Sequence, residues 1–504
     1  MMLGRKTLLI NPPLINGVAF TRQGRCQERD DVLGTTKPPY TLALLASILR
    51  QEGVELRLVD ATIERLSIDQ VIARLDAEGF APTLILFPST TPTLDADVEA
   101  IARLKAHYGA PMFCFGPHAS TVPAVSMERA PAVDGMFVGE PEDAVRQLAR
   151  LDSISRLGEI ASLTWRTPQG AVVPHRAHGS YDGFLTMPYP SWDLVPIREY
   201  ALPLVDKPYV IVETSRGCPY SCDFCVAPIH QGHKFRQRGA KDLVDEIERT
   251  YRERGIEYFY LWGDTVTLNV KAFTAFCDEL IARNLPIHWF GNARADNLTD
   301  PAFVHRLKRA GCWMLALGIE TESEDVRKDM VKRLERQKIE AAFRNMRQAG
   351  IKSFAFFIFG YPGETLDTID QTVNYAIELD PDFANFYPAV PYPGTELFDK
   401  VVKEGLLPPG AENEWARMEY SYYLLSGNGL NEKVVMDAIH RAKRRFFLRP
   451  GYIARHLGDV ARLAFSKRAI FLQVASRTLF GGRTIDTASG AFRGSATLAG
   501  ADRR

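Results

Sequence analysis

The chain has 504 residues, a length typical of about three domains. Of these residues, 46% are hydrophobic and 24% are charged, as in ordinary globular proteins. Lys and Arg together number 61, as do Asp and Glu, so the zero net charge argues against a protein that binds nucleic acid through general phosphate attraction. The sequence contains no run of 18 apolar residues, and its first apolar run is too short for a secretion signal. We therefore expect no transmembrane helix and a cytoplasmic location.

Residues 1–150 alternate short apolar runs with amphipathic helical patterns. The expected strands are 7–11, 56–60, 83–87, 112–116 and 135–139. The expected helices are 40–53, 68–79, 94–109 and about 119–129. Alternation of this kind predicts an α/β fold with a doubly wound parallel sheet, for which we expect the strand order 2-1-3-4-5. A ligand of such a sheet binds beyond the carboxyl ends of the strands.

Residues 151–205 differ in composition and are expected to form a linker with some structure of its own. The stretch "SLTWRTPQGAVVPHR" predicts a hairpin around Pro168–Gly170. The stretch "MPYPSWDLVP" contains too many prolines for a long helix.

Strand and helix patterns alternate again in residues 206–400, where six units predict a partial (β/α)6 barrel of the TIM type. The expected strands are 209–215, 257–263, 287–293, 314–320, 353–360 and 383–390. A helix over 240–255 is expected to end at Gly255. The active site of such a barrel lies at the carboxyl ends of its strands. Residues 401–504 are expected to be mainly helical.

The stretch "RGCPYSCDFCV" directly follows the first barrel strand and contains Cys218, Cys222 and Cys225 in the spacing C-x3-C-x2-C. A redox pair needs two cysteines and a closed zinc site needs four ligands, whereas three thiolates can bind three irons of a [4Fe–4S] cluster and leave the fourth iron open. Phe224 can cover such a cluster. The alternative is a zinc site that borrows His230 or His233 as its fourth ligand.

This cysteine motif, with an aromatic residue before its third cysteine, resembles that of the radical S-adenosylmethionine superfamily. The resemblance implies that S-adenosylmethionine chelates the open iron and is cleaved by one electron to methionine and a 5′-deoxyadenosyl radical. That radical would take hydrogen from an unactivated C–H bond. The electron would come from a reductase, a flavodoxin or a ferredoxin.

The same resemblance assigns S-adenosylmethionine contacts to the ends of four further barrel strands. These contacts are Gly263 and Asp264 near the amino group, Asn292 and Arg294 near the ribose and carboxylate, Glu320, and Gly360 near the adenine. The alternative for each is a strand-end turn residue or an ion pair within the protein.

Residues 1–150 resemble the cobalamin-binding domain of the cobalamin-dependent branch of this superfamily. The resemblance assigns cofactor contacts to three loops, at Ser89 and Thr90, at Gly116 and His118, and at Gly139 and Glu140. The cobalt-ligating motif D-x-H-x-x-G is missing, so His118 is expected to contact the corrin or to stabilise its own turn. The alternative is a domain that keeps the fold but binds no cobalamin.

Taken together, the resemblance implies a methyltransferase that acts on an unactivated carbon of a small-molecule or lipid-like substrate, and it identifies no catalytic side chain. The alternative is a radical cyclase or oxidase like the anaerobic magnesium-protoporphyrin ester cyclase. A methylthiotransferase acting on transfer RNA is disfavoured because Cys26 and Cys114 are too few for a second cluster. A sensor without enzymatic activity would not need an open iron.

The last hundred residues contain a basic amphipathic segment. Its positive residues are Arg441, Lys443, Arg444, Arg445, Arg449, Arg455, Arg462, Lys467 and Arg468. Such a segment can lie on an anionic membrane, which would place the protein at the periphery of the inner membrane. The alternative is a helix that packs on the barrel.

Overall fold

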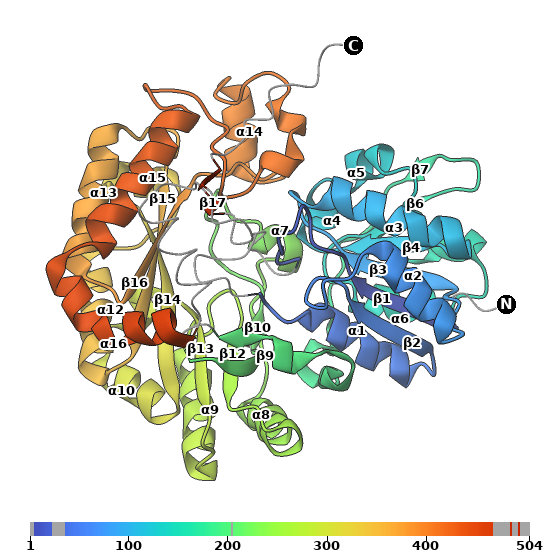
Figure 1. Ribbon diagram of the computed structural model, residues 1–504, viewed down its shortest axis with the longest axis horizontal. Helices are drawn as coiled ribbons and strands as arrows, with labels where there is room; N and C mark the ends of the chain where they lie inside the picture. The colour runs from blue at the N-terminus through green and yellow to red at the C-terminus, as the bar shows by residue number, and fades with distance from the viewer. Residues whose placement is uncertain (1–4, 23–35, 203–204, 467–483, 486–491, 494–504) are drawn as a thin grey trace.

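Figure 1 shows the computed structural model, which describes residues 5–22, 36–202, 205–466, 484–485 and 492–493. An N-terminal α/β domain lies beside a curved barrel sheet, and helix α7 lies between them. Cys26, Lys467 and Arg468, which the sequence analysis considered, lie outside the described residues.

The N-terminal domain contains the predicted parallel sheet. Its strands are β1 (Lys6–Asn11), β2 (Glu55–Asp60), β3 (Leu84–Pro88), β4 (Met112–Phe115) and β5 (Gly135–Phe137). They pair in the order β2-β1-β3-β4-β5, which confirms the predicted order. The flanking helices are α1 (Tyr40–Gln51), α2 (Ile68–Ala77), α3 (Leu94–Tyr108) and α6 (Glu142–Arg150). Every residue of β3 is buried, which explains why its sequence is continuously apolar.

The helix expected over about 119–129 is broken into α4 (Pro117–Thr121) and α5 (Pro123–Arg129). Pro123 cannot donate a backbone hydrogen bond, and its ring keeps Val122 out of the helical region, at φ −135° and ψ 53°.

The predicted hairpin is present as β6 (Leu163–Arg166) and β7 (Val172–Val173). Strand β6 pairs antiparallel with β5, so the hairpin extends the N-terminal sheet to seven strands. The rest of the linker forms only single turns, as its proline content predicts. These turns are η1 (Ile154–Glu159), η2 (Asp182–Thr186), η3 (Trp192–Leu194) and η4 (Ile197–Glu199).

The second sheet is the predicted partial barrel of six parallel strands. They are β9 (Lys207–Glu213), β12 (Tyr258–Trp262), β13 (His288–Ala293), β14 (Cys312–Glu320), β15 (Lys352–Phe359) and β16 (Phe383–Pro388). They follow one another in sequence order, and the short β8 (Ala201–Leu202) adds antiparallel to β9. Helices cover the outer face: α8 (Ala240–Arg254), α9 (Val270–Arg283), α10 (Pro301–Arg309), α12 (Arg336–Ala349) and α13 (Leu366–Leu379). As predicted, α8 ends at Gly255, which is left-handed with φ 68°.

Two short connections at the carboxyl ends of the barrel strands contain helical turns, η5 (Ala295–Leu298) and α11 (Glu324–Asp329). The connection after β9 contains β10 (Ser215–Arg216), α7 (Ala227–Gln231) and β11 (Arg236–Gln237), and the three cysteines lie within it. Strands β10 and β11 pair antiparallel and close the base of this loop.

The C-terminal region is mainly helical in its described part. Its elements are α14 (Glu396–Lys403), η6 (Ala411–Asn413), η7 (Trp415–Arg417), α15 (Glu432–Phe447), α16 (Pro450–Ser466), β17 (Thr484–Ile485) and β18 (Phe492–Arg493). Helix α15 packs on β16 and α13, so it covers the outer edge strand of the barrel (Figure 1).

Several of the basic residues in α15, in α16 and between them pair with acidic residues of the barrel. Arg445 bonds to Asp370 at 3.0 Å, and both Arg449 and Arg455 pair with Asp380. These contacts support the packed alternative for this segment. No described helix combines the length and the hydrophobicity that a membrane span requires.

Candidate active site

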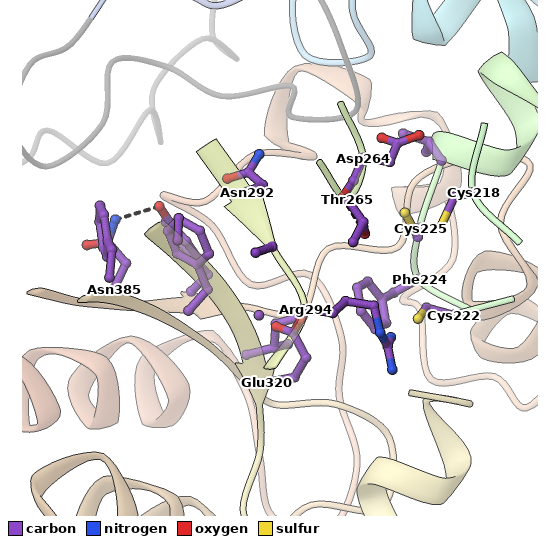
Figure 2. A pocket seen from close by; sticks show the side chains of 18 of the residues that line it. Cys218, Cys222, Phe224, Cys225, Asp264, Thr265, Asn292, Arg294, Glu320 and Asn385 are labelled. Atoms are coloured by element: carbon purple, nitrogen blue, oxygen red, sulfur yellow. Dashed lines mark hydrogen bonds between the residues drawn. The ribbon is translucent and has the colours of Figure 1, made fainter. Parts of the chain in front are cut away.

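A cavity of about 280 Å³ opens at the carboxyl ends of the barrel strands (Figure 2). Side chains from all six parallel strands or the loops after them line this cavity, as expected for a barrel of this type. The predicted site residues among them are Cys218, Cys222, Phe224, Cys225, Asp264, Asn292, Arg294 and Glu320. The structure thus brings together residues that are up to 102 positions apart in the sequence.

The cysteine loop is held in a tight shape by its own backbone. Gly217 has φ +82°, and a Cβ atom there would lie 2.2 Å from the carbonyl oxygen of Lys234, so only glycine fits. The N–H of Cys218 donates to Gly232 at 3.1 Å, and the N–H of Cys225 donates to Cys222 at 3.1 Å. None of the described cysteines forms a disulfide. Three thiols that line one cavity form a donor set that fits an iron–sulfur cluster.

The two histidines proposed as zinc ligands lie elsewhere. His230 bonds to the hydroxyl of Ser120 at 2.9 Å and lines a separate small cavity between the domains. His233 is exposed on the surface. These positions do not support the zinc alternative.

The ends of β12 and β13 place their predicted residues at the mouth of the cavity. Gly263 packs against the cysteine loop, because a Cβ atom there would lie 2.4 Å from the hydroxyl oxygen of Ser215. Asp264 lines the cavity directly beyond this contact. The amide of Asn292 donates to the hydroxyl of Tyr260 at 2.9 Å.

Two buried charged residues occupy the middle of the cavity wall. The guanidinium of Arg294 lies 3.7 Å from the ring centre of Tyr220 and pairs with Asp296 at 3.1 Å. Glu320 pairs with Lys332 at 2.7 Å and has the unusual φ of +70° where β14 shifts its register. The expected contacts of Arg294 and Glu320 with S-adenosylmethionine remain predictions, and the ion pairs that the sequence left as alternatives are present.

The loop after β15 is fixed by buried hydrogen bonds. Gly360 has φ +79° and packs against the ring of Tyr423, whose hydroxyl donates to the Gly360 carbonyl at 2.8 Å. Glu364 accepts from the N–H groups of Gly360 at 2.7 Å and Tyr361 at 3.1 Å. The hydroxyl of Tyr361 donates to Asp223 of the cysteine loop at 2.5 Å. This loop therefore supports the cysteine loop from the barrel side, which the sequence alone did not indicate.

The end of the cavity away from the cysteines is aromatic. Tyr260 and Phe290 stack with ring centres 4.6 Å apart, and the ring centres of Tyr387 and Tyr420 lie 4.2 Å apart. The amide of Asn385, which Figure 2 shows far from Cys218, donates to Tyr387 at 2.6 Å. The same wall contains Trp313, Phe354 and Phe356.

The sequence analysis did not predict this aromatic wall, and not every aromatic residue near the strand ends belongs to it. Phe290 and Tyr361 line the cavity. Trp289 is fully buried in the core, and Trp262 lines the small cavity between the domains. The wall could have been predicted from β15, because side chains alternate between the two faces of a strand. In β15 the residues alternate between half-buried and buried.

The predicted cobalamin contacts at Ser89, Thr90 and Gly116 lie at the carboxyl ends of β3 and β4. Gly116 has φ +120°, and a Cβ atom there would lie 2.6 Å from the carbonyl oxygen of Ser89. The hydroxyl of Ser89 donates to Asp97 at 3.0 Å, and the hydroxyls of Thr90 and Thr93 lie 2.9 Å apart. All these side chains are buried, so their observed bonds shape the strand-end loops.

His118 stabilises its own loop, which is one of the two roles that the sequence left open. Its Nδ1 bonds to Thr91 at 3.0 Å, its Nε2 bonds to Ser126 at 2.9 Å, and its ring packs edge-on against Trp415. Burial lowers the pKa of His118 to about 3, so the ring is neutral. The corrin contact of His118 remains a prediction, and protein encloses the whole ring in this structure.

The predicted cobalamin contacts of Gly139 and Glu140 remain predictions, and both residues have contacts within the protein. A Cβ atom on Gly139 would lie 2.4 Å from the carbonyl oxygen of Gly179, so this glycine allows the linker to approach. Glu140 accepts from the N–H of Tyr181 at 2.6 Å and pairs with Arg216 at 3.2 Å and with Arg236. Glu140 therefore contacts the base of the cysteine loop.

A second small cavity lies at the carboxyl ends of β1 and β3, where a doubly wound sheet binds its ligand. Its wall includes Asn11, Arg22 and Pro88. This cavity has a volume of only about 10 Å³. Lys37 lines both this cavity and the barrel cavity, so the two cavities adjoin at this residue.

Comparison with known proteins finds a related family for each of the two α/β domains. The profile of the Radical SAM superfamily matches residues 212–376, and the profile of the B12 binding domain matches residues 31–149. The first range contains the cysteine loop, and the second contains five of the eight residues that line the strand-end cavity.

Several similar proteins align with most of the chain. An uncharacterized methyltransferase of Pyrococcus horikoshii is 26% identical over 90% of this chain and 94% of its own. The anaerobic magnesium-protoporphyrin IX monomethyl ester cyclase of Rubrivivax gelatinosus is 26% identical over 82% of this chain and 75% of its own. The structure of the radical S-adenosylmethionine methyltransferase TsrM from Kitasatospora setae, with cobalamin and a [4Fe–4S] cluster bound, aligns with a TM-score of 0.64. It is 20% identical and covers 81% of this chain and 80% of its own, which shows a shared fold.

Proposed function

Because the chain belongs to the radical SAM superfamily and carries a B12-binding domain, we propose that it is a cobalamin-dependent methyltransferase for an unactivated carbon of a small, uncharged molecule. One observation carries this proposal. A single cavity contains all three cysteines at one end and an aromatic wall at the other, and it adjoins the strand-end cavity of the B12-binding domain at Lys37.

The residues that line the barrel cavity fit two of the cofactors of this family, the cluster and S-adenosylmethionine. Cys218, Cys222 and Cys225 would hold a [4Fe–4S] cluster, and Asp264, Asn292, Arg294 and Glu320 would hold S-adenosylmethionine beside it. When bound, the cluster supplies the electron that cleaves S-adenosylmethionine, and cobalamin carries the methyl group to the substrate. An electron donor of the flavodoxin or ferredoxin type would reduce the cluster.

The distribution of charge in the cavity favours an uncharged substrate. Asp264, Arg294 and Glu320, with its partner Lys332, lie on the side of the cysteines or in the middle (Figure 2). The remaining cation, Lys37, lies where this cavity adjoins that of the N-terminal domain. The far wall has aromatic rings and the neutral amide of Asn385. An ionised group would lose hydration there without gaining a partner of opposite charge, whereas a planar or apolar molecule would stack on the rings. The Asn385 amide would recognise a single polar substituent.

The similarity to the ester cyclase keeps ring closure or oxidation as the second candidate, because the same cavity would serve either outcome. The two differ in their products. Methyl transfer through cobalt consumes S-adenosylmethionine to S-adenosylhomocysteine as well as to 5′-deoxyadenosine, whereas a cyclase that transfers no methyl group forms only the latter.

The deciding experiment measures iron, cobalt and S-adenosylmethionine turnover after anaerobic purification from cells supplied with cobalamin. The wild-type protein should hold about four irons, as a cubane cluster requires, and one cobalt per chain. On reduction it should form both 5′-deoxyadenosine and S-adenosylhomocysteine.

The variant Cys222→Ala should lose the iron and all formation of 5′-deoxyadenosine but keep the cobalt. The matched control Cys277→Ala removes a buried thiol of α9 outside the cavity and should keep both metals. A wild-type protein that holds four irons but no cobalt would exclude methyl transfer through cobalt. A protein that holds both metals without cleaving S-adenosylmethionine would point to a sensor.

A further inference from the structure

The base of the cysteine loop is a two-stranded ribbon that faces the N-terminal domain. Strands β10 and β11 pair so that Arg216 lies directly opposite Arg236. Cys218, the first cluster ligand, follows Arg216 by two residues. The position of this arginine pair therefore fixes where the cysteine loop leaves the barrel.

Arg216 joins the two domains through three carboxylates. Its guanidinium lies 3.2 Å from Glu140 and 2.7 Å from Glu142, which belong to the B12-binding domain. It also lies 2.8 Å from Glu213 at the end of β9. All four side chains are at most 5% exposed. Charge-assisted bonds of this kind have narrowly defined geometry, and removing one partner leaves a buried charge without compensation.

Arg236 adds a second connection to the same carboxylate. It pairs with Glu140 and donates to the hydroxyl of Ser180 at 3.3 Å. Both guanidiniums lie over the ring of Phe184, Arg216 at 5.0 Å and Arg236 at 5.6 Å. The linker and the N-terminal domain thus enclose the arginine pair from the side opposite the barrel.

Helix α7, which follows the third cysteine, is held from the same side. The hydroxyl of Ser120 bonds to His230 at 2.9 Å, and His178 bonds to the carbonyl oxygen of Ile229 at 2.6 Å. The N–H of Gly139 also donates to Ser120, at 3.0 Å. Both ends of the cysteine loop are therefore fixed by residues that precede the barrel in the sequence.

We propose that Glu140 and Glu142 are positioning residues for the iron–sulfur cluster: through Arg216 and Arg236 they set the three cysteines relative to the B12-binding domain. The inference rests on the cluster of the proposed function. It assigns to the N-terminal domain a role in holding the cluster, in addition to binding cobalamin.

The test uses the full chain with Glu142→Gln, which keeps the size of the side chain and removes its charge. After anaerobic reconstitution with iron and sulfide, the rate of iron release to a chelator is measured. Loss of a residue that contacts a metal ligand directly typically weakens metal binding about 10- to 100-fold. Glu142 acts through Arg216, so we expect iron release to be faster by the lower end of this range, about tenfold. The electron paramagnetic resonance spectrum of the reduced cluster should also change, because the cysteines shift around it.

The matched control is Asp97→Asn. Asp97 forms an equally buried pair with Arg22 at 2.8 Å, but this pair lies within the N-terminal domain, where Asp97 belongs to α3. Thermal unfolding of the two cluster-free variants measures how much stability each substitution removes. Even if the control loses as much stability as Glu142→Gln, it should release iron at the wild-type rate. Glu140→Gln, which weakens both arginine contacts, serves as a second variant should Glu142→Gln fold poorly.

The outcomes separate this inference from the proposed function. If Glu142→Gln and Glu140→Gln both release iron at the wild-type rate and show the wild-type spectrum, the inference is wrong. The proposed function would not be affected by that result. Equally fast iron release from Asp97→Asn would overturn the inference too, because general destabilisation would then explain the effect. A wild-type protein that takes up no iron would refute both the inference and the proposed function.

Discussion

Glu364 is a carboxyl group that the loop after β15 buries completely. Burial raises its pKa to about 7, and the hydrogen bonds from Tyr361, Gly360 and Thr321 offset only part of this effect. Because the folded protein holds the proton more tightly than the unfolded chain, the protonated form contributes stability at low pH. This contribution is lost as the pH rises from about 4.3, the ordinary value for Glu, to about 7.

Glu364→Gln should remove this pH dependence, because a neutral amide still accepts the two N–H bonds but does not titrate. We expect the free energy of unfolding of the variant relative to wild type to rise by up to about 3 kcal/mol between pH 4.5 and pH 8. Urea unfolding of the cluster-free proteins at both pH values measures this difference. A relative stability that stays constant across this range would show that Glu364 is not protonated in the folded protein.

At the scale of elements, α15 covers the outer edge of the barrel through one deeply buried ring. Phe446 is fully buried, and its ring centre lies 6.2 Å from that of Phe386 in β16 and 5.4 Å from that of Tyr452. Arg449 stacks on the same ring at 4.4 Å. This segment therefore uses its aromatic and basic residues to pack on the barrel.

Phe446→Ala should lower the free energy of unfolding by about 3–5 kcal/mol, the usual range for removing a buried aromatic ring. Leu448→Ala, at a side chain that is 45% exposed, is the control and should change stability by less than about 0.5 kcal/mol. Denaturant unfolding of the two variants tests this contrast. Equal stability of the two would mean that α15 is not docked on β16 in solution.

Strands, helices and loops could be predicted where a short stretch of sequence is enough to identify them. The strands of the N-terminal sheet are continuously apolar because helices cover both faces, and that pattern can be read without knowing any partner. The break in the helix before Pro123 is equally local, although the sequence analysis overlooked it. The cysteine loop was predictable because its three ligands lie within eight residues of one another.

Individual roles at the strand ends were not predictable, because they depend on partners far away in the sequence. His118 is enclosed partly by Trp415, and Glu140 meets Arg236, which lies 96 positions further along the chain. A loop motif indicates that a residue lies at a strand end. It does not indicate whether the residue faces a ligand or another part of the protein.

At the scale of the whole molecule, the C-terminal region returns to the N-terminal domain. Trp415 is 3% exposed, packs edge-on against His118 and lies under the guanidinium of Arg129 at 4.5 Å. Arg129 also donates to the carbonyl oxygen of Asn413 at 2.8 Å, a contact that spans 284 positions. The N-terminal domain is thus joined to the rest of the protein in two ways: by the linker that precedes the barrel and by contacts with the region that follows it.

Trp415→Ala should destabilise the N-terminal domain by about 3 kcal/mol or more, because it leaves a cavity beside a buried histidine. Differential scanning calorimetry should show the change as a lower unfolding temperature. Tyr422→Ala, at a side chain that is 37% exposed in the same region, is the control and should leave the transition nearly unchanged. Identical shifts in both variants would contradict a specific contact at Trp415.

The arginine pair at the base of the cysteine loop restricts how this enzyme can be recombined. A chimera that joins this barrel to the N-terminal domain of a distant relative keeps Arg216 and Arg236 but replaces Glu140 and Glu142. Two buried positive charges would then face whatever the donor domain offers. A chimera should therefore fold correctly only if it takes both carboxylates and both arginines from the same parent. The smallest segment that can be exchanged thus extends from the B12-binding domain through the cysteine loop.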